Sequence, residues 1–412
     1  MMIQLNRHRH GRGKAAIYLT IALFVAVSGQ AASQSRAGSG GSRFSHGRIH
    51  SVVEEGRMLP GAIDAFARPL FGGSRAPSAR YAVDVAVLRI YTRYPSGALT
   101  QTRVQVFVPD TAAPEAVYLF APGSTGLIGI CRPSREHEAG IVWGRYRAHV
   151  LAVAAQGFIG VLPDYIGFED AEGIQPYFHA ESEARVLFNA LYAVDQWVRT
   201  QLPDGIESLT RVAAGYSQGG HAAFAAADRN ELLGGALALD GVIGYGPTTE
   251  IEPLFRTYPS LAPMVVMSFA SIYGRDRVDP HAILLDRWAD ELEYDTTRQC
   301  VGGIQRFYPS SPAGLFDPTF LASLQADRLD QTHPSIAAVF AANRTGLGGQ
   351  RLPVLILQGT DDVVVRRSVQ DRFVSNLRRQ GTPVEYIVYD GVRHDTRQIA
   401  FSDVIAWIRA LE

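Results

Sequence analysis

Hydrophobic residues are grouped along this chain of 412 residues in short runs that alternate with helical patterns. Segments 81–94 and 102–108 flank a Pro-Ser-Gly turn at 95–97, which is typical of an antiparallel hairpin. Short apolar runs predict further strands, at 117–120, 158–162, 211–214, 237–244, 354–357 and 384–389. Helical patterns predict helices at 181–201, 222–227 and 401–411.

Strands that alternate with helices predict a mostly parallel, twisted sheet with helices on both faces. The alternation stops between residues 246 and 350, which is too long for an unstructured connection. We therefore expect a cap inserted above the carboxyl ends of the strands, where α/β folds bind ligands. The apolar residues at 264–269 and 272–273 have two interpretations, the core of the cap itself or the lining of a pocket.

The first 48 residues have a different character. Residues 1–14 are basic, an apolar run follows at 15–27, and small residues occupy 28–32. This pattern predicts an export signal, residues 1–32, with an uncleaved signal anchor as the alternative. Residues 33–48 are rich in Ser, Gly and Arg and predict a disordered linker. The folded domain is then 49–412, in a secreted or periplasmic protein.

Charge and composition exclude several classes of function. The formal net charge of -1 argues against nucleic acid as a partner. Lys14 is the only lysine, so the mature chain would hold no Ser–Lys dyad, Schiff-base lysine or P-loop lysine. Neither a His-Glu-x-x-His motif nor a Gly-x-Gly-x-x-Gly motif after a strand is present, so no metal and no cofactor are predicted.

A Gly-x-Ser-x-Gly motif at residues 215–219 lies between a predicted strand and an Ala-rich helix. In a nucleophile elbow of this kind, a strained turn holds the serine, here Ser217, at the carboxyl edge of the sheet. Small residues at Gly215 and Gly219 let the strand and the helix pass closely. A glycine-rich turn before a core helix is the alternative interpretation.

A nucleophilic serine needs a base and an acid, and in α/β-hydrolases they follow in the order Ser, acid, His. Only one histidine beyond Ser217 follows a late strand, namely His394. His221 lies in the elbow helix, and His281 and His333 lie in the predicted cap. We therefore predict His394 as the base.

Two adjacent aspartates follow the strand at 354–357. The spacing from the preceding glycine favours Asp362 as the acid, with Asp361 as a solvated or turn-capping residue. Asp390 and Asp395 flank His394 itself and are poorer candidates.

The developing oxyanion of an acyl transfer needs preorganised donors. The backbone N–H of Gln218, directly after the nucleophile, is one predicted donor. The other is a backbone N–H of the loop at 123–126, where Ser124 is the first choice and Thr125 the alternative.

Together these motifs resemble the secretory lipase family of α/β-hydrolases, which includes fungal lipase A enzymes and bacterial exported esterases. The resemblance runs in order from about residue 80 to residue 412. Pro122 stands where the family has His, and Val365 stands where it has Pro after the acid. The segments that carry the resemblance are Ala-Pro-Gly-Ser-Thr-Gly at 121–126, Cys-Arg-Pro-Ser at 131–134, residues 156–167, the elbow at 215–222, the acid segment at 359–362 and His394.

This resemblance implies an α/β-hydrolase fold with a helical cap and hydrolysis of carboxylic esters, including lipids. The expected partner is a small-molecule or lipid ester, with the cap as the part that would meet a lipid interface. The family also implies a disulfide bridge from the loop that begins at residue 123 to the cap. An exported protein with only two cysteines usually joins them in a disulfide. We expect a Cys131–Cys300 disulfide, with two free buried thiols as the alternative.

The same triad also serves peptide or aminoacyl hydrolysis and acyl transfer, which stay open as alternatives. A binding protein on an inactive hydrolase scaffold is a further alternative. The intact set of Ser217, Asp362 and His394 argues against it, because binding alone would not require all three.

Overall fold

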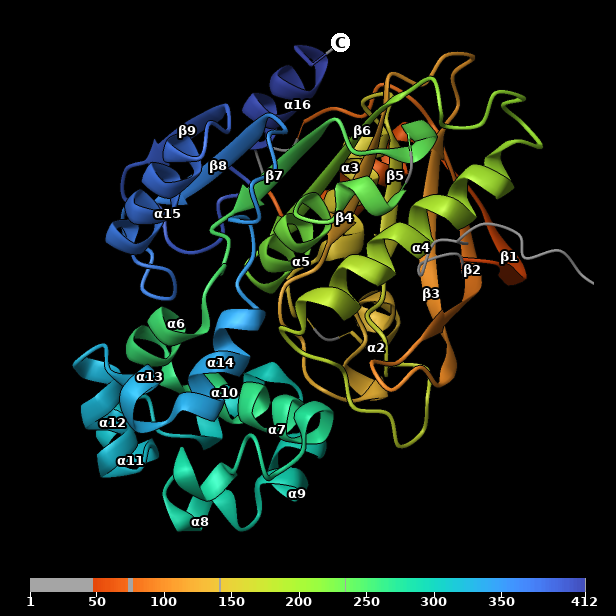
Figure 1. Ribbon diagram of the computed structural model, residues 1–412. Coiled ribbons are helices and arrows are strands. Elements are labelled where there is room, and N and C mark those ends of the chain that lie inside the picture. The colour runs from red at the N-terminus through yellow and green to blue at the C-terminus, as the bar shows by residue number, and fades with distance from the viewer. Residues whose placement is uncertain (1–46, 73–76, 141, 234, 412) are drawn as a thin grey trace, which may run out of the picture. The chain divides into compact units, whose positions relative to one another are not determined.

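In the part of the chain that the structure describes, nine strands form one sheet in the order β1-β2-β3-β5-β4-β6-β7-β8-β9 (Figure 1). The computed structural model describes residues 47–72, 77–140, 142–233 and 235–411. Strands β1, β2, β3 and β5 pair antiparallel, and every pair from β5–β4 to β8–β9 is parallel. The strands are β1 (Ile49–Met58), β2 (Val83–Arg93), β3 (Leu99–Pro109), β4 (Ala116–Ala121), β5 (Ile159–Pro163), β6 (Thr210–Tyr216), β7 (Gly241–Tyr245), β8 (Val354–Gly359) and β9 (Val384–Tyr389).

The predicted hairpin is β2 and β3, whose ladder runs from Val83 opposite Pro109 to Arg93 opposite Leu99. Buried and partly exposed residues nearly alternate along β2, which explains why its pattern was legible in the sequence. Strand β1 pairs with β2 at the edge of the sheet, and the sequence pattern did not predict it. Almost all of its residues are exposed, so no apolar alternation marks it.

Helices cover both faces of the sheet (Figure 1), and each set buries its own apolar cluster. On one face lie α4 (Ala180–Val198), α5 (Gln218–Ala227) and α15 (Arg367–Arg379). On the other lie α1 (Pro60–Ala67), α3 (Tyr146–Ala154) and α16 (Phe401–Arg409), and the short α2 (Glu136–Ala139) precedes α3. This doubly covered parallel sheet is the predicted fold class.

Strand β7 begins later than the apolar pattern predicts. The run at 237–244 suggested one strand, but residues 235–237 form a short 3-10 helix and the strand starts at Gly241. Polar contacts occupy the residues between them: Leu239 N–H donates to Asn230 Oδ1 at 2.7 Å, and the Asp240 carboxylate accepts from Arg211 N–H at 2.8 Å. Side-chain competition for these backbone groups therefore delays the ladder.

The long interruption between β7 and β8 is a group of helices with its own apolar core (Figure 1). Met264, Val265 and Phe269 are buried in that core, which favours the first interpretation of this apolar segment. Ile272 and Tyr273 instead line an open cleft of about 670 Å³. The helices are α6 (Ile251–Thr257), α7 (Ala262–Tyr273), α8 (Asp286–Ala289), α9 (Leu292–Thr297), α10 (Val301–Phe307), α11 (Pro312–Leu315), α12 (Pro318–Gln325), α13 (Leu329–Thr332) and α14 (Pro334–Ala342).

The predicted signal at 1–32 and most of the predicted linker lie outside the described residues. Gly47 and Arg48, its last two positions, are described, and the Arg48 carbonyl accepts a hydrogen bond from Tyr91 N–H at 3.0 Å. Across the described part of the chain, none of the helices has both the length and the apolar character that a membrane span requires.

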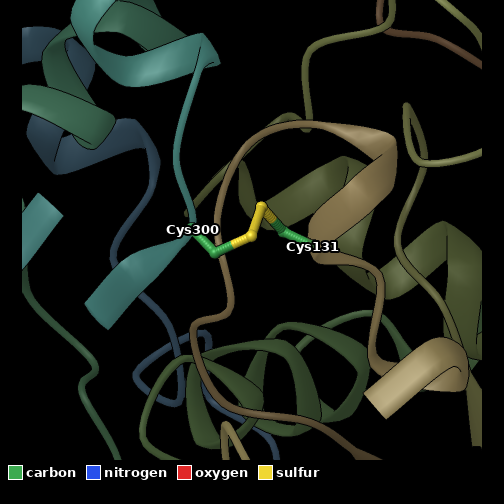
Figure 2. The surroundings of a disulfide bond; sticks show 2 residues. All are labelled: Cys131 and Cys300. Carbon is green, nitrogen blue, oxygen red and sulfur yellow. A yellow bond between two sulfur atoms is a disulfide. The ribbon is translucent and has the colours of Figure 1, made fainter. Parts of the chain in front are cut away.

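A disulfide joins Cys131, in the loop after β4, to Cys300, at the start of α10 in the cap (Figure 2). The loop and the cap also touch through backbone, since Val301 N–H donates to Thr125 C=O at 2.8 Å. Gly126, with φ at +145°, packs against the bond so closely that a Cβ there would lie 2.6 Å from Cys131 Sγ. The disulfide therefore ties the cap directly to the loop that follows β4.

We expect that removing this bond with Cys131→Ser and Cys300→Ser together destabilises the protein. The bond closes a separation of 169 residues, for which the chain-entropy model gives about 5 kcal/mol before any relaxation. Urea unfolding of the double variant beside the wild type measures the change, and a thiol titration of the denatured, unreduced wild type provides the control. Two titratable thiols would contradict the bond.

Candidate active site

Ser217 occupies the turn between β6 and α5 with φ 55° and ψ -114°. A positive φ is uncommon for a residue with a side chain and costs on the order of 1–3 kcal/mol, so surrounding contacts must hold it. Ser217 N–H donates to Tyr245 C=O at 3.0 Å, and Thr248 N–H donates to Ser217 C=O at 3.2 Å. The serine is thereby fixed at the ends of β6 and β7, with 7% of its surface exposed.

The elbow depends on close backbone contacts. A Cβ at Gly219 would lie 1.9 Å from the carbonyl oxygen of Ala121, at the end of β4. A Cβ at Gly215 would lie 1.9 Å from the carbonyl oxygen of Gly219. The helix that follows Ser217 therefore starts in contact with two strands, as the glycine spacing predicts.

His394 and Asp362 form a buried pair. His394 Nδ1 lies 2.7 Å from Asp362 Oδ2, and the aspartate side chain is fully buried. The other oxygen, Asp362 Oδ1, accepts from the backbone N–H groups of Val364 and Val365 at 2.8 and 2.9 Å. A carboxylate held in this way favours the tautomer with the proton on Nδ1, which leaves Nε2 as a base.

The serine and the pair lie on neighbouring segments. Tyr216, directly before Ser217, packs its ring against His394 with the centroids 5.0 Å apart. A Cβ at Gly246 would lie 3.1 Å from His394 Nδ1 and 3.2 Å from Asp362 Oδ2. Among the described residues, His394 Nε2 is buried without a hydrogen-bond partner. This nitrogen is the atom that a base would use.

The other candidate acids have different partners. Asp361 is exposed, and its backbone N–H donates to Val392 C=O at 2.9 Å. Asp390 Oδ1 accepts from the hydroxyl of Thr360 at 3.3 Å. Asp395 forms an ion pair with Arg397. The structure thus brings His394 to Asp362 and to no other of these carboxylates.

The other histidines beyond the elbow are also engaged elsewhere. His221 is fully buried, with Nδ1 2.5 Å from Glu183 Oε2 and Nε2 2.7 Å from Asn343 C=O. His281 Nδ1 contacts Asp286 at 3.0 Å, and His333 bonds the hydroxyl of its neighbour Thr332. With both ring nitrogens occupied, His221 is unsuited to proton transfer.

Two segments supply the predicted oxyanion donors. Gln218 begins α5, and the first N–H groups of a helix have no partner within it. Ser124 follows β4, and its hydroxyl oxygen lies 2.6 Å from the hydroxyl of Tyr177. The alternative residue, Thr125, has its carbonyl engaged by the cap. Within this loop, Gly123 lies close to Tyr146, since a Cβ at Gly123 would lie 2.8 Å from the Tyr146 hydroxyl oxygen.

A buried ion pair directly after His394 was not recognised from the sequence. Arg397 is fully buried, and it donates to Asp395 through Nε at 2.9 Å and Nη2 at 2.6 Å. Burial alone would lower the pKa of Arg397, but the Asp395 carboxylate raises that pKa above its ordinary value. The guanidinium lies over three aromatic rings, those of Phe120, Tyr146 and Tyr216. The loop that carries the histidine is therefore anchored to the sheet.

Glu136 is a second buried charged residue that the sequence pattern did not reveal. It is 5% exposed and accepts backbone N–H bonds from four successive residues, 143–146. These N–H groups lead into α3, whose first residue is Tyr146, so the carboxylate lies at the N-terminal end of that helix. Within the described residues, no cluster of three or more His, Cys, Asp or Glu side chains could hold a metal ion.

In sequence, the chain matches no family model and no curated protein. In structure it resembles the rice cell wall degrading esterase LipA from Xanthomonas oryzae, with a TM-score of 0.70 and 18% identity over 89% of this chain and 97% of that chain. It also resembles a putative hydrolase from Legionella pneumophila, with a TM-score of 0.72 and 17% identity over 88% of this chain and 98% of that chain. Candida antarctica lipase A in its closed state is similar with a TM-score of 0.64 and 14% identity over 88% of this chain and 80% of that chain.

These similarities extend over most of each chain, and at such low identity they establish the fold. The mostly parallel sheet, the serine elbow after β6 and the helical insertion after β7 are consistent with them. The chain therefore has an α/β-hydrolase fold with a helical cap, and it shares that fold with known lipases and esterases.

Proposed function

We propose that this chain is an exported serine hydrolase that cleaves carboxylic esters through an acyl-enzyme. The observation that carries the proposal is the buried His394–Asp362 hydrogen bond beside a serine in a strained elbow. The base has its Nε2 unengaged among the described residues. Such a set performs nucleophilic acyl transfer in hydrolases of unrelated folds.

In the proposed reaction, the Ser217 hydroxyl oxygen attacks the ester carbonyl carbon while His394 Nε2 accepts the hydroxyl proton. The carbonyl π electrons move onto oxygen, where the N–H of Gln218 and a donor at Ser124 stabilise the charge. The tetrahedral intermediate collapses, the C–O bond to the alcohol breaks, and His394 gives its proton to the alcohol. Water then attacks the acyl-enzyme in the same way and releases the acid.

Asp362 has an orienting role in this scheme. Its Oδ1 is fixed by two backbone N–H groups, so its Oδ2 is held in place for His394 Nδ1. The carboxylate stabilises the imidazolium that forms when the serine proton is transferred. It keeps its negative charge throughout the cycle.

The relatives in structure guide the choice of substrate. One is named as an esterase that degrades rice cell wall and another as a lipase. We infer a small-molecule or lipid ester, with the cap as the part that would meet a lipid interface. The basic and apolar pattern at 1–32 supports action outside the cytoplasm, as does the disulfide.

The proposal predicts hydrolysis of p-nitrophenyl esters with a rate that depends on acyl length, because the cap limits the space for the acyl chain. Ser217→Ala should lower kcat by roughly 10³-fold or more while the far-UV spectrum stays that of the wild type. Aminoacyl anilides assayed in parallel test the alternative chemistry. Faster cleavage of the anilides than of every ester would overturn the assignment to esters.

The two adjacent aspartates provide a matched pair of variants. Asp362→Asn should lower kcat/KM by roughly 10³- to 10⁴-fold, because an amide no longer holds the proton on His394 Nδ1. Asp361→Asn should stay within about twofold of the wild type, since that side chain is exposed and away from the imidazole. Steady-state kinetics on one ester measures both, and the reverse result would assign the acid to Asp361.

A further inference from the structure

One buried carboxylate contacts both the elbow helix that begins at Gln218 and the segment whose Tyr177 bonds Ser124. Glu183, in α4, is 1% exposed. Its Oε1 accepts from Gln218 Nε2 at 2.8 Å and from Phe178 N–H at 3.1 Å. Its Oε2 lies 2.5 Å from His221 Nδ1. A buried charge with three partners of this kind is costly to desolvate and is satisfied only in one arrangement of those partners.

On the elbow side, the carboxylate spans the first turn of α5. Gln218 and His221 are the first and fourth residues of that helix, directly after Ser217. Glu183 binds the side chains of both, so the turn cannot rotate without losing a hydrogen bond in a dry environment. These contacts thereby fix the direction of the Gln218 backbone N–H, which is one proposed oxyanion donor.

On the loop side, the same carboxylate fixes the segment that supports Ser124. Phe178 has φ at +56°, which is strained for an aromatic residue. Its N–H is bound by Glu183, and its ring packs edge-on against His221 at 5.0 Å between centroids. The adjacent Tyr177 bonds the Ser124 hydroxyl at 2.6 Å. The segment that Glu183 bonds at Phe178 thus also supplies the hydrogen-bond partner of Ser124.

The network also shows which substitution preserves its geometry. The Asn343 carbonyl can only accept, so His221 Nε2 carries a proton. The Glu183 carboxylate also only accepts, so its contact with His221 Nδ1 needs a proton on that nitrogen, whereas an amide at position 183 can donate to the same nitrogen when it is unprotonated. The amide oxygen can still accept from Gln218 and Phe178, so Glu183→Gln keeps each contact while it removes the charge.

From these contacts we propose that Glu183 is a positioning residue of the oxyanion hole, setting the separation between its two donors; this rests on the proposed function. It acts through Gln218 on one side and through Phe178 and Tyr177 on the other. A carboxylate that only supported helix packing would change the unfolding temperature and leave the rate per folded active site unaltered. A positioning role changes that rate, because oxyanion donors act in the transition state.

The test compares Glu183→Ala, Glu183→Gln and Glu181→Ala on one p-nitrophenyl ester, with active sites counted by exhaustive fluorophosphonate labelling. Glu183→Ala should lower kcat per labelled site by about 10- to 100-fold with KM within about twofold. Its Ki for a trifluoromethyl ketone, which forms an oxyanion on the serine, should rise by a similar factor. Glu183→Gln should recover most of kcat. Glu181, half-exposed on the same helix, is the matched control and should leave kcat unchanged.

An unaltered kcat per labelled site in Glu183→Ala would overturn the inference, even with a lowered unfolding temperature. If that variant does not fold, Tyr177→Phe and Gln218→Met each remove one arm of the network with little change in volume. Each should lower kcat several-fold at constant KM, and unaltered kcat in both would overturn the inference too. A wild type that neither hydrolyses esters nor takes the label would overturn the proposed function itself, which separates the two failures.

Discussion

The contact between the start of α5 and the end of β4 is the constraint on which the rest of the site depends. No side chain fits at Gly219, because the carbonyl oxygen of Ala121 occupies the space. The approach brings the N-terminal end of the helix to the carboxyl edge of the sheet, with Ser217 at the apex. It also brings the loop after β4, which contains Ser124, to the side of the helix end. Both proposed donors and the nucleophile owe their proximity to this one packing restriction.

Local patterns made the strands and the elbow legible in the sequence, because each rests on residues that are close in the chain. The glycines around Ser217, the alternation along β2 and the apolar run of β8 are all of this kind. The chain order of the fold then selected His394, and the spacing from Gly359 selected Asp362; the structure places the two side chains 2.7 Å apart. The exposed strand β1 lacked any such local signal, and the delayed start of β7 depended on side chains of Asn230 and Asp240.

The sequence did not predict which charged side chains are buried. Glu183 and Arg397 each look like surface residues in their local context, yet each is buried and bonded to partners far away in the chain. Arg397, for example, donates to the carbonyl of Gly144, on a segment 253 residues earlier. A charge at such a place is tolerated only when the fold provides its partners. Its burial is therefore a property of the tertiary structure.

The disulfide has a consequence for the time at which the protein acquires its chemistry during synthesis. Cys131 leaves the ribosome 169 residues before Cys300. The disulfide therefore cannot tie the loop after β4 to the cap until the cap has been synthesised as far as Cys300. The segments with Asp362 and His394 emerge later still, after the entire cap. A partly made chain would thus hold an elbow serine with no base, no acid and an untethered loop. On the proposed mechanism, the nascent protein stays inert toward esters until its last strands have joined the sheet, and an oxidising compartment then ties the loop to the cap.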